Sequence, residues 1–202
     1  MSGNKFGKKS VLVALFAAII SAGAFIQIPL PGGVPVTIQD MLAMLSGLLL
    51  GPVYGGLAVL LFLFLGCIGL PVFTGKAGIN VILYGPTGGF LIGYLLSAIA
   101  GGLLIHFLVK PEQTCSEEGE IIEAPKGVKV YNWVIITLIS IVQIIVLFAL
   151  GIIFFCHVKP DFEFQKVLSI VLIPFIPGNI IKLIISVPLV KRLRPAIKNF
   201  LD

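Results

Sequence analysis

The chain has 202 residues, of which 58% are hydrophobic and only 11% are charged, and its mean hydropathy is +1.13. This composition is typical of an integral membrane protein and exceeds what the core of a water-soluble domain requires. The net charge of +5 does not indicate nucleic-acid binding, because the basic residues stand in small groups beside apolar segments, as topology signals do.

Six apolar segments predict an all-α integral membrane protein, a six-helix transmembrane bundle that forms a single membrane domain over residues 1–202. The segments are 11–28, 40–50, 53–70, 80–109, 131–156 and 167–190. The first follows three lysines, as a signal peptide would, but its length favours a retained span. The second is too short to cross a core of about 30 Å at about 1.5 Å per residue, and Gly51-Pro52 predicts a tight reversal into the third.

The distribution of lysine and arginine predicts that both termini are cytoplasmic. With the amino terminus inside, ten basic residues flank the spans on the inner side, and only Lys76, Lys159 and Lys166 lie outside. Residues 111–130 then form a cytoplasmic polar connector between the fourth and fifth helices. Their five glutamates and two lysines are typical of a solvated segment.

Residues 66–89 interrupt the apolar pattern with seven glycines and two prolines, and they carry Lys76, Asn80, Tyr84 and Thr87. Glycine and proline break helices, and bare backbone cannot face hydrocarbon. This segment must therefore line a cavity enclosed by protein or water, which makes it a candidate binding site.

Small residues at four-residue spacing predict close helix contacts. Ala14, Ala18 and Ala22 share one face of the first helix, where either a partner protein or another helix of the bundle could pack. The small residues from 85 to 101 favour packing within the bundle. For Gln143, in the middle of the fifth helix, we expect a hydrogen bond between helices rather than a ligand contact.

Lys182 is the only basic residue well inside an apolar span. A charge at a helix centre costs on the order of 3 kcal/mol, so the ammonium group should face the interior and an accepting partner; snorkelling is the alternative. Residues 174–179 break the sixth helix just before it, and Asn179 lies on the same face. A broken helix beside a charge is typical of a solute site, although a simple proline kink has the same sequence.

At the outer edge, Asp40 opens the second helix, and we interpret it as a helix cap or first-turn charge. Thr37 and Gln39 either fold over a pocket or are solvated loop residues. The cysteines and histidines lack the spacing of a metal site or disulfide framework, and no phosphate-binding loop is present. Acid–base catalysis by Asp40 and His106 is disfavoured, because they should lie at opposite ends of the bundle. We therefore predict no catalytic residues.

Five motifs follow one another along the chain: IPLPGGVPVTIQ at 28–39, LLLGP at 48–52, GLPVF at 69–73, GPTGGF at 85–90 and PGNIIK at 177–182. Together they resemble the BioY family, the biotin-specific substrate-binding (S) subunits of energy-coupling factor (ECF) transporters. The resemblance covers nearly the whole chain except residues 111–130.

The resemblance implies a multi-pass protein of the bacterial cell membrane that captures biotin at the outer face. Import is then driven by a transmembrane coupling subunit and two subunits that bind and hydrolyse ATP, so the chain is not an enzyme and carries no cofactor of its own. Ala14, Ala18 and Ala22 correspond to the surface that docks on the coupling subunit. The same architecture with another vitamin or a biotin precursor, or a solitary facilitator, remains the alternative.

The resemblance also implies a set of ligand-binding residues: Asn80, Asn179, Lys182, Tyr84, Gln39 and Thr37. The amide oxygens of Asn80 and Asn179 could accept from the two ureido N–H groups of biotin. Lys182 could donate to the ureido oxygen or offset the carboxylate, and both options stay open. Asn179 stands where the family usually has aspartate, so Lys182 is expected to lack its usual neighbouring counter-ion.

Overall fold

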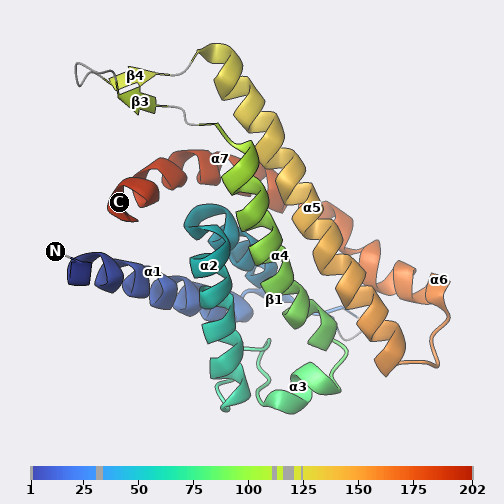
Figure 1. Cartoon of the computed structure of the whole chain (residues 1–202). Coiled ribbons are helices and arrows are strands. Elements are labelled where there is room, and N and C mark those ends of the chain that lie inside the picture. The colour runs from blue at the N-terminus through green and yellow to red at the C-terminus, as the bar shows by residue number, and fades with distance from the viewer. Residues whose placement is uncertain (1, 31–33, 111–112, 116–120, 124, 202) are drawn as a thin grey trace.

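The computed structural model describes residues 2–30, 34–110, 113–115, 121–123 and 125–201. Helices account for most of these residues, and Figure 1 shows how they are arranged. The α-helices are α1 (Ser2–Ala22), α2 (Gln39–Cys67), α3 (Ile79–Leu83), α4 (Gly88–Leu108), α5 (Lys126–Val158), α6 (Phe164–Val167) and α7 (Phe175–Leu201). A 3₁₀ turn (Gly23–Phe25) follows α1, and a π-helical turn (Leu168–Leu172) follows α6.

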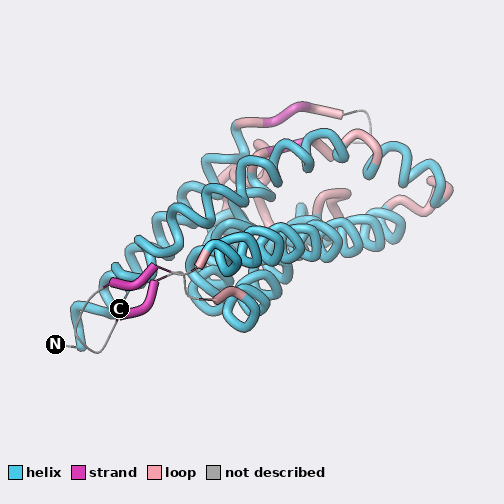
Figure 2. Tube along the Cα trace, turned by 90° about the horizontal axis from the view of Figure 1, so that it is seen from above, coloured by secondary structure: helices cyan, strands magenta, loops and turns pink. Residues whose placement is uncertain are grey.

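The described strands form two short hairpins, drawn in magenta in Figure 2. β1 (Gln27–Ile28) pairs antiparallel with β2 (Val36–Thr37), and β3 (Gln113–Cys115) pairs with β4 (Ile121–Glu123). The first helix therefore ends at Ala22 and not at residue 28 as predicted, because the backbone beyond it pairs with β2. The β1–β2 pairing brings Thr37 to the start of α2.

Four helices, α1, α2, α4 and α5, contain stretches long and apolar enough to cross a membrane. A fifth candidate is a bent pair, in which Phe164–Leu172 and Phe175–Ile197 meet at an angle of 42°. The prediction of six spans counts the two halves of α2 separately, because the segments 40–50 and 53–70 both lie inside it.

The chain reverses direction inside α2, at Gly51. This glycine has φ 81° and ψ −178°, a conformation that side-chain-bearing residues rarely adopt. Beyond it, Gly55 packs against Gly47: a Cβ on Gly55 would lie 2.6 Å from the Gly47 Cα. The Ser46 hydroxyl also donates to the Gly55 carbonyl at 3.2 Å. Eight residues of straight helix would separate these groups by about 12 Å, so the two halves of α2 fold back on each other.

Three other boundaries differ from the predictions. The segment 80–109 is interrupted after α3, because Pro86 cannot continue a helix, and α4 begins at Gly88. The connector is shorter than predicted, because residues 126–130 already belong to α5, while residues 111–112, 116–120 and 124 lie outside the described residues. The last helix runs to Leu201, well past residue 190.

Gln143 joins three helices at the centre of the bundle. It is completely buried on α5, and its amide Nε2 donates to the Ser97 carbonyl of α4 at 2.9 Å and to the Met44 carbonyl of α2 at 3.3 Å. Space for this side chain exists because residue 101 is glycine, since a Cβ there would overlap the Gln143 amide. The predicted interhelical hydrogen bond of Gln143 is confirmed, and so is the packing of the small α4 residues within the bundle.

Candidate functional site

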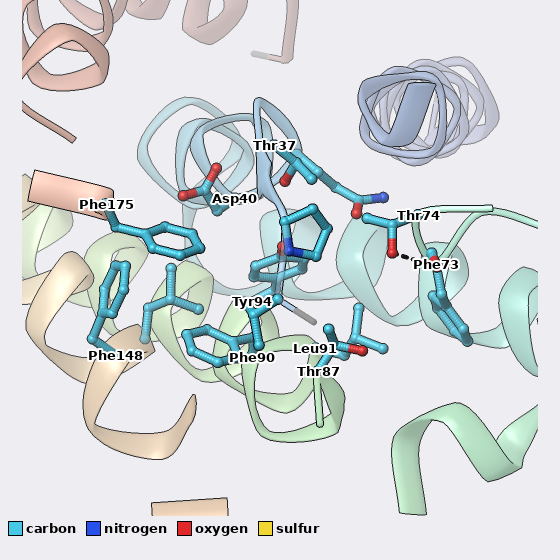
Figure 3. Close-up of a pocket in the computed structure, with 14 residues that line it drawn as sticks. Thr37, Asp40, Phe73, Thr74, Thr87, Phe90, Leu91, Tyr94, Phe148 and Phe175 are labelled. Atoms are coloured by element: carbon cyan, nitrogen blue, oxygen red, sulfur yellow. Dashed lines mark hydrogen bonds between the residues drawn. The ribbon is translucent and has the colours of Figure 1, made fainter. Parts of the chain in front are cut away.

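A pocket lies between the β1–β2 hairpin, the start of α2, α4, α5 and the start of α7 (Figure 3). Its empty space is about 450 Å³ when the part open to the outside is included. Ligand pockets commonly have this mixture of an apolar wall with a few polar groups. The residues that line it are Val34, Pro35, Thr37, Gln39, Asp40, Phe73, Thr74, Thr87, Phe90, Leu91, Tyr94, Leu147, Phe148 and Phe175.

Three phenylalanines from three helices form an aromatic wall. The ring centroids of Phe90 (α4) and Phe148 (α5) are 5.7 Å apart, and Phe175 lies 5.3 Å from Phe148 and 6.5 Å from Phe90. Phe175 reaches this wall because α7 begins there, after the bend that follows the π-helical turn. Figure 3 shows Asp40 and Thr37 on the opposite side of the pocket from Phe90 and Phe148.

Asp40 and Lys182 form an ion pair at the edge of the pocket. The Lys182 Nζ lies 2.7 Å from one Asp40 carboxylate oxygen and 2.8 Å from the other. The Asp40 side chain is only 8% exposed and the Lys182 side chain 13%. The interior orientation predicted for Lys182, with an anionic partner, is confirmed, and the snorkelling alternative is wrong. The neighbouring residue Asn179 supplies no counter-ion, as expected, and Asp40 takes that place from 142 residues away.

The helix-cap interpretation of Asp40 is wrong as well. The residue at the N-cap of α2 is Ile38, and no side chain caps this end of the helix. Asp40 does lie in the first turn, where the helix dipole favours a negative charge, but its carboxylate turns toward α7. Sequence reasoning treated Asp40 and Lys182 separately, although two charges in apolar surroundings are each other's natural partners.

The Gln39 side chain is fully buried and leaves one acceptor unpaired in the pocket wall. Its amide Nε2 donates to the Ile20 carbonyl at 3.1 Å and to the Val72 carbonyl at 3.0 Å. Two carbonyl partners fix the orientation of the amide, since only the nitrogen can donate. The Oε1 atom then has no hydrogen-bond partner among the described residues. A buried acceptor without a partner costs about 1–3 kcal/mol, so this atom is an unsatisfied polar group in the wall.

With the pocket and its polar groups located, comparisons with known proteins give the family. A family model described as the BioY family matches residues 3–199. The chain belongs to the BioY family. The resemblance on the five motifs is thereby confirmed, and with it the prediction that the chain is not an enzyme, because the relatives are transporters.

Two relatives of this BioY chain cover most of its length. The protein named biotin transporter BioY of Thermotoga maritima is 32% identical over 190 residues, which are 93% of this chain and 96% of the relative. The biotin transporter BioY of Rhodobacter capsulatus is 36% identical over 184 residues, 87% of each chain.

A solved structure, the S-component for biotin from an ECF-type ABC transporter, is 31% identical to the BioY chain. It matches with a TM-score of 0.76 over 96% of this chain and 95% of the other. This likeness, together with the apolar helices, confirms the predicted all-α membrane fold of the S-component type.

The predicted site residues of this BioY chain do not all meet at the pocket. Thr37 and Gln39 lie in its wall, buried rather than solvated, whereas Asn179 is buried on α7 outside the lining. Asn80 and Tyr84 belong to α3 and its end, both are exposed, and neither lines the pocket. The roles of all of these residues in binding stay predictions.

Sequence reasoning missed several residues of the wall. The stretch 66–89 does reach the pocket, through Thr87, which the sequence had singled out, and through Phe73 and Thr74, which it had not; Asn80 and Tyr84 are not in the lining. Thr74 has a positive φ of 52°, which is uncommon outside glycine and marks a tightly held loop. Tyr94 was detectable as a hydroxyl inside an apolar segment, whereas Phe148 and Phe175 have no signal that separates them from other core aromatics.

The predicted docking residues occupy a second surface of the BioY chain. Ala14, Ala18 and Ala22 are all exposed on α1, while Ala17 and Ile20 on the opposite face are buried. The alternative that this stripe packs inside the bundle is therefore wrong. Elsewhere among the described residues, no three histidine, cysteine, aspartate or glutamate side chains gather where they could hold a metal ion.

Proposed function

We propose that this BioY protein is the biotin-binding subunit of an ECF-type vitamin uptake transporter in the bacterial cell membrane. It captures biotin at the outer face, and partner subunits that hydrolyse ATP drive the import; the chain itself uses no cofactor. The observation that carries the proposal is the unpaired, buried Oε1 atom of Gln39 in the wall of a mostly apolar pocket. Two full-length relatives and a structural neighbour named for biotin support it.

Biotin and the pocket have complementary chemistry. The ureido ring of biotin carries two N–H donors and one carbonyl acceptor on a bicycle that is otherwise apolar. The Gln39 Oε1 accepts from one N–H, and the Phe90, Phe148 and Phe175 rings pack against the apolar part. The hydroxyls of Thr37 and Tyr94 stand in the same wall and supply donors for the ureido oxygen.

The exposed alanine stripe of α1 serves as the docking surface for the transmembrane coupling subunit. Small side chains let a partner helix approach closely, and the stripe is left uncovered by the bundle. The two ends of the chain lie together, since the Lys8 Nζ is 5.0 Å from the centroid of the Phe200 ring. This supports a common side for both termini, and the excess of lysine and arginine there makes that side the cytoplasm.

Two measurements test the proposal. Calorimetry on the purified protein should show biotin binding that other vitamins do not displace. Displacement by another vitamin would show that the site binds that vitamin instead. Uptake of labelled biotin into vesicles should require the coupling and ATP-hydrolysing subunits and ATP. Uptake by vesicles that contain this chain alone would establish a solitary facilitator instead.

A further inference from the structure

We propose that Asp40 is a specificity-determining residue: its carboxylate accepts from the uncharged, N–H-bearing ring of the ligand and keeps a ligand carboxylate away from this end of the pocket. The inference rests on the proposed function, because it assigns one end of biotin to one end of the site.

The two partners of the ion pair are placed differently relative to the pocket. Asp40 belongs to the residues that line the pocket, whereas Lys182, its ion-pair partner, does not. Of the fourteen residues that line the pocket, Asp40 alone carries a formal charge at neutral pH. The wall of this space therefore contains one acidic residue and no basic one.

The ion pair also decides what Lys182 can do. Both carboxylate oxygens of Asp40 lie within 2.8 Å of the Lys182 Nζ, so the positive charge is compensated inside the protein. A ligand carboxylate next to Asp40 would be repelled by the nearer charge, and displacing Asp40 from Lys182 would leave a buried anion without a partner. Of the two roles left open for Lys182, offsetting the ligand carboxylate is thereby disfavoured.

The same oxygens are good acceptors for a neutral donor. An ionised carboxylate has about four lone-pair sites, of which Lys182 occupies two, so Asp40 retains acceptor capacity. The neighbouring residue, Gln39, contributes its unpaired Oε1 to the same wall. Two adjacent residues thus offer two acceptors, and a cyclic urea offers two N–H donors. A hydrogen bond to an ionised acceptor is about twice as strong as one to a neutral acceptor. Asp40 therefore contributes more than Gln39 to the preference for a ligand ring that carries N–H donors.

The test compares two ligands on two variants by calorimetry. Biotin and 2-iminobiotin differ only at the ring head, where the imine analogue takes up a proton and becomes cationic. In Asp40→Asn, 2-iminobiotin should weaken by at least about tenfold more than biotin, because the cationic head loses its anion and faces uncompensated Lys182. The matched control, Asp161→Asn, changes an exposed acid between α5 and α6 and should leave both affinities unchanged.

The outcomes separate the inference from the proposed function. If Asp40→Asn weakens both ligands by the same factor, Asp40 acts only as the counter-ion of Lys182, and the inference is overturned while biotin binding stands. If the wild-type protein binds no biotin, the proposed function itself fails.

A measurement on the wild-type protein covers the case in which Asp40→Asn does not fold. Methylation of a ureido nitrogen should weaken binding by at least about 100-fold, whereas esterification of the biotin carboxylate should cost less than about tenfold. The reverse order would place the carboxylate at Asp40 and overturn the inference.

Discussion

The side chain of Gln143 fills the space that is left because residue 101 is glycine. The Gln143 amide lies where a Cβ of residue 101 would stand, and from there it donates to the carbonyls of Ser97 and Met44. Gln143 thus holds α5 to α4 and α2, and residue 101 has to be glycine because a Cβ there would overlap the Gln143 amide.

Gly101→Ala should destabilise the protein by several degrees in thermal unfolding, because its methyl group displaces the Gln143 amide and breaks both hydrogen bonds. A buried carbonyl or amide left without a partner costs about 1–3 kcal/mol. Thermal unfolding in detergent measures the change. Gly127→Ala is the control, because a Cβ there meets nothing within 4 Å. Equal unfolding temperatures for the two variants would contradict the packing described here.

Lys182→Ala should weaken biotin binding at least about tenfold and lower stability, because it leaves the buried Asp40 carboxylate without its cation. Calorimetry and thermal unfolding report the two effects separately. Lys159→Ala removes an exposed lysine beyond the end of α5 and should change neither. Near-wild-type affinity for Lys182→Ala would remove this ammonium group from the mechanism of binding.

Gln39→Leu should weaken biotin binding at least about tenfold, since leucine has a similar volume but offers no acceptor to the ureido N–H. It also leaves the Ile20 and Val72 carbonyls without their donor, so the folded state must be verified first. Gln39→Glu separates the two effects: it keeps an acceptor oxygen in the pocket and should retain more affinity than leucine at equal fold. An equal loss in both variants would show that only the amide N–H matters.

Replacing Ala14 and Ala18 together by leucine should leave biotin binding within about twofold of wild type but abolish co-purification with a coupling subunit, because the larger side chains block close helix approach. Ala149→Leu places the same change on an exposed face of α5 and should preserve the complex. Co-purification of the double variant would assign the docking surface elsewhere.

Much of the fold was readable from local patterns. The apolar segments, the reversal at Gly51 and the break before α7 all follow from composition over a few neighbouring residues, and the depth of Lys182 alone required an interior partner. The loop sequence left Thr37 and Gln39 open between a place in the pocket and solvation, and it was the family resemblance that made them ligand candidates.

What could not be read was which distant residues meet. The partner of Lys182, Asp40, lies 142 residues earlier. The local sequence around Asp40 is equally consistent with a helix cap, so it does not reveal this pairing. The exposed position of Asn80 depends on the path of the loop after α2, where Thr74 and three glycines, Gly69, Gly75 and Gly78, turn the chain with positive φ. Such a path is set by tertiary packing, and a motif match carries no information about it.

The Gln39 amide links the end of α1 to the wall of the pocket. Its nitrogen binds the Ile20 carbonyl of α1, two residues from Ala18 and Ala22, while its oxygen belongs to the pocket wall. A tilt of α1 relative to α2 cannot occur without stretching this bond or rotating the amide. The Gln39 amide therefore connects the helix that carries the exposed alanines to the wall of the pocket.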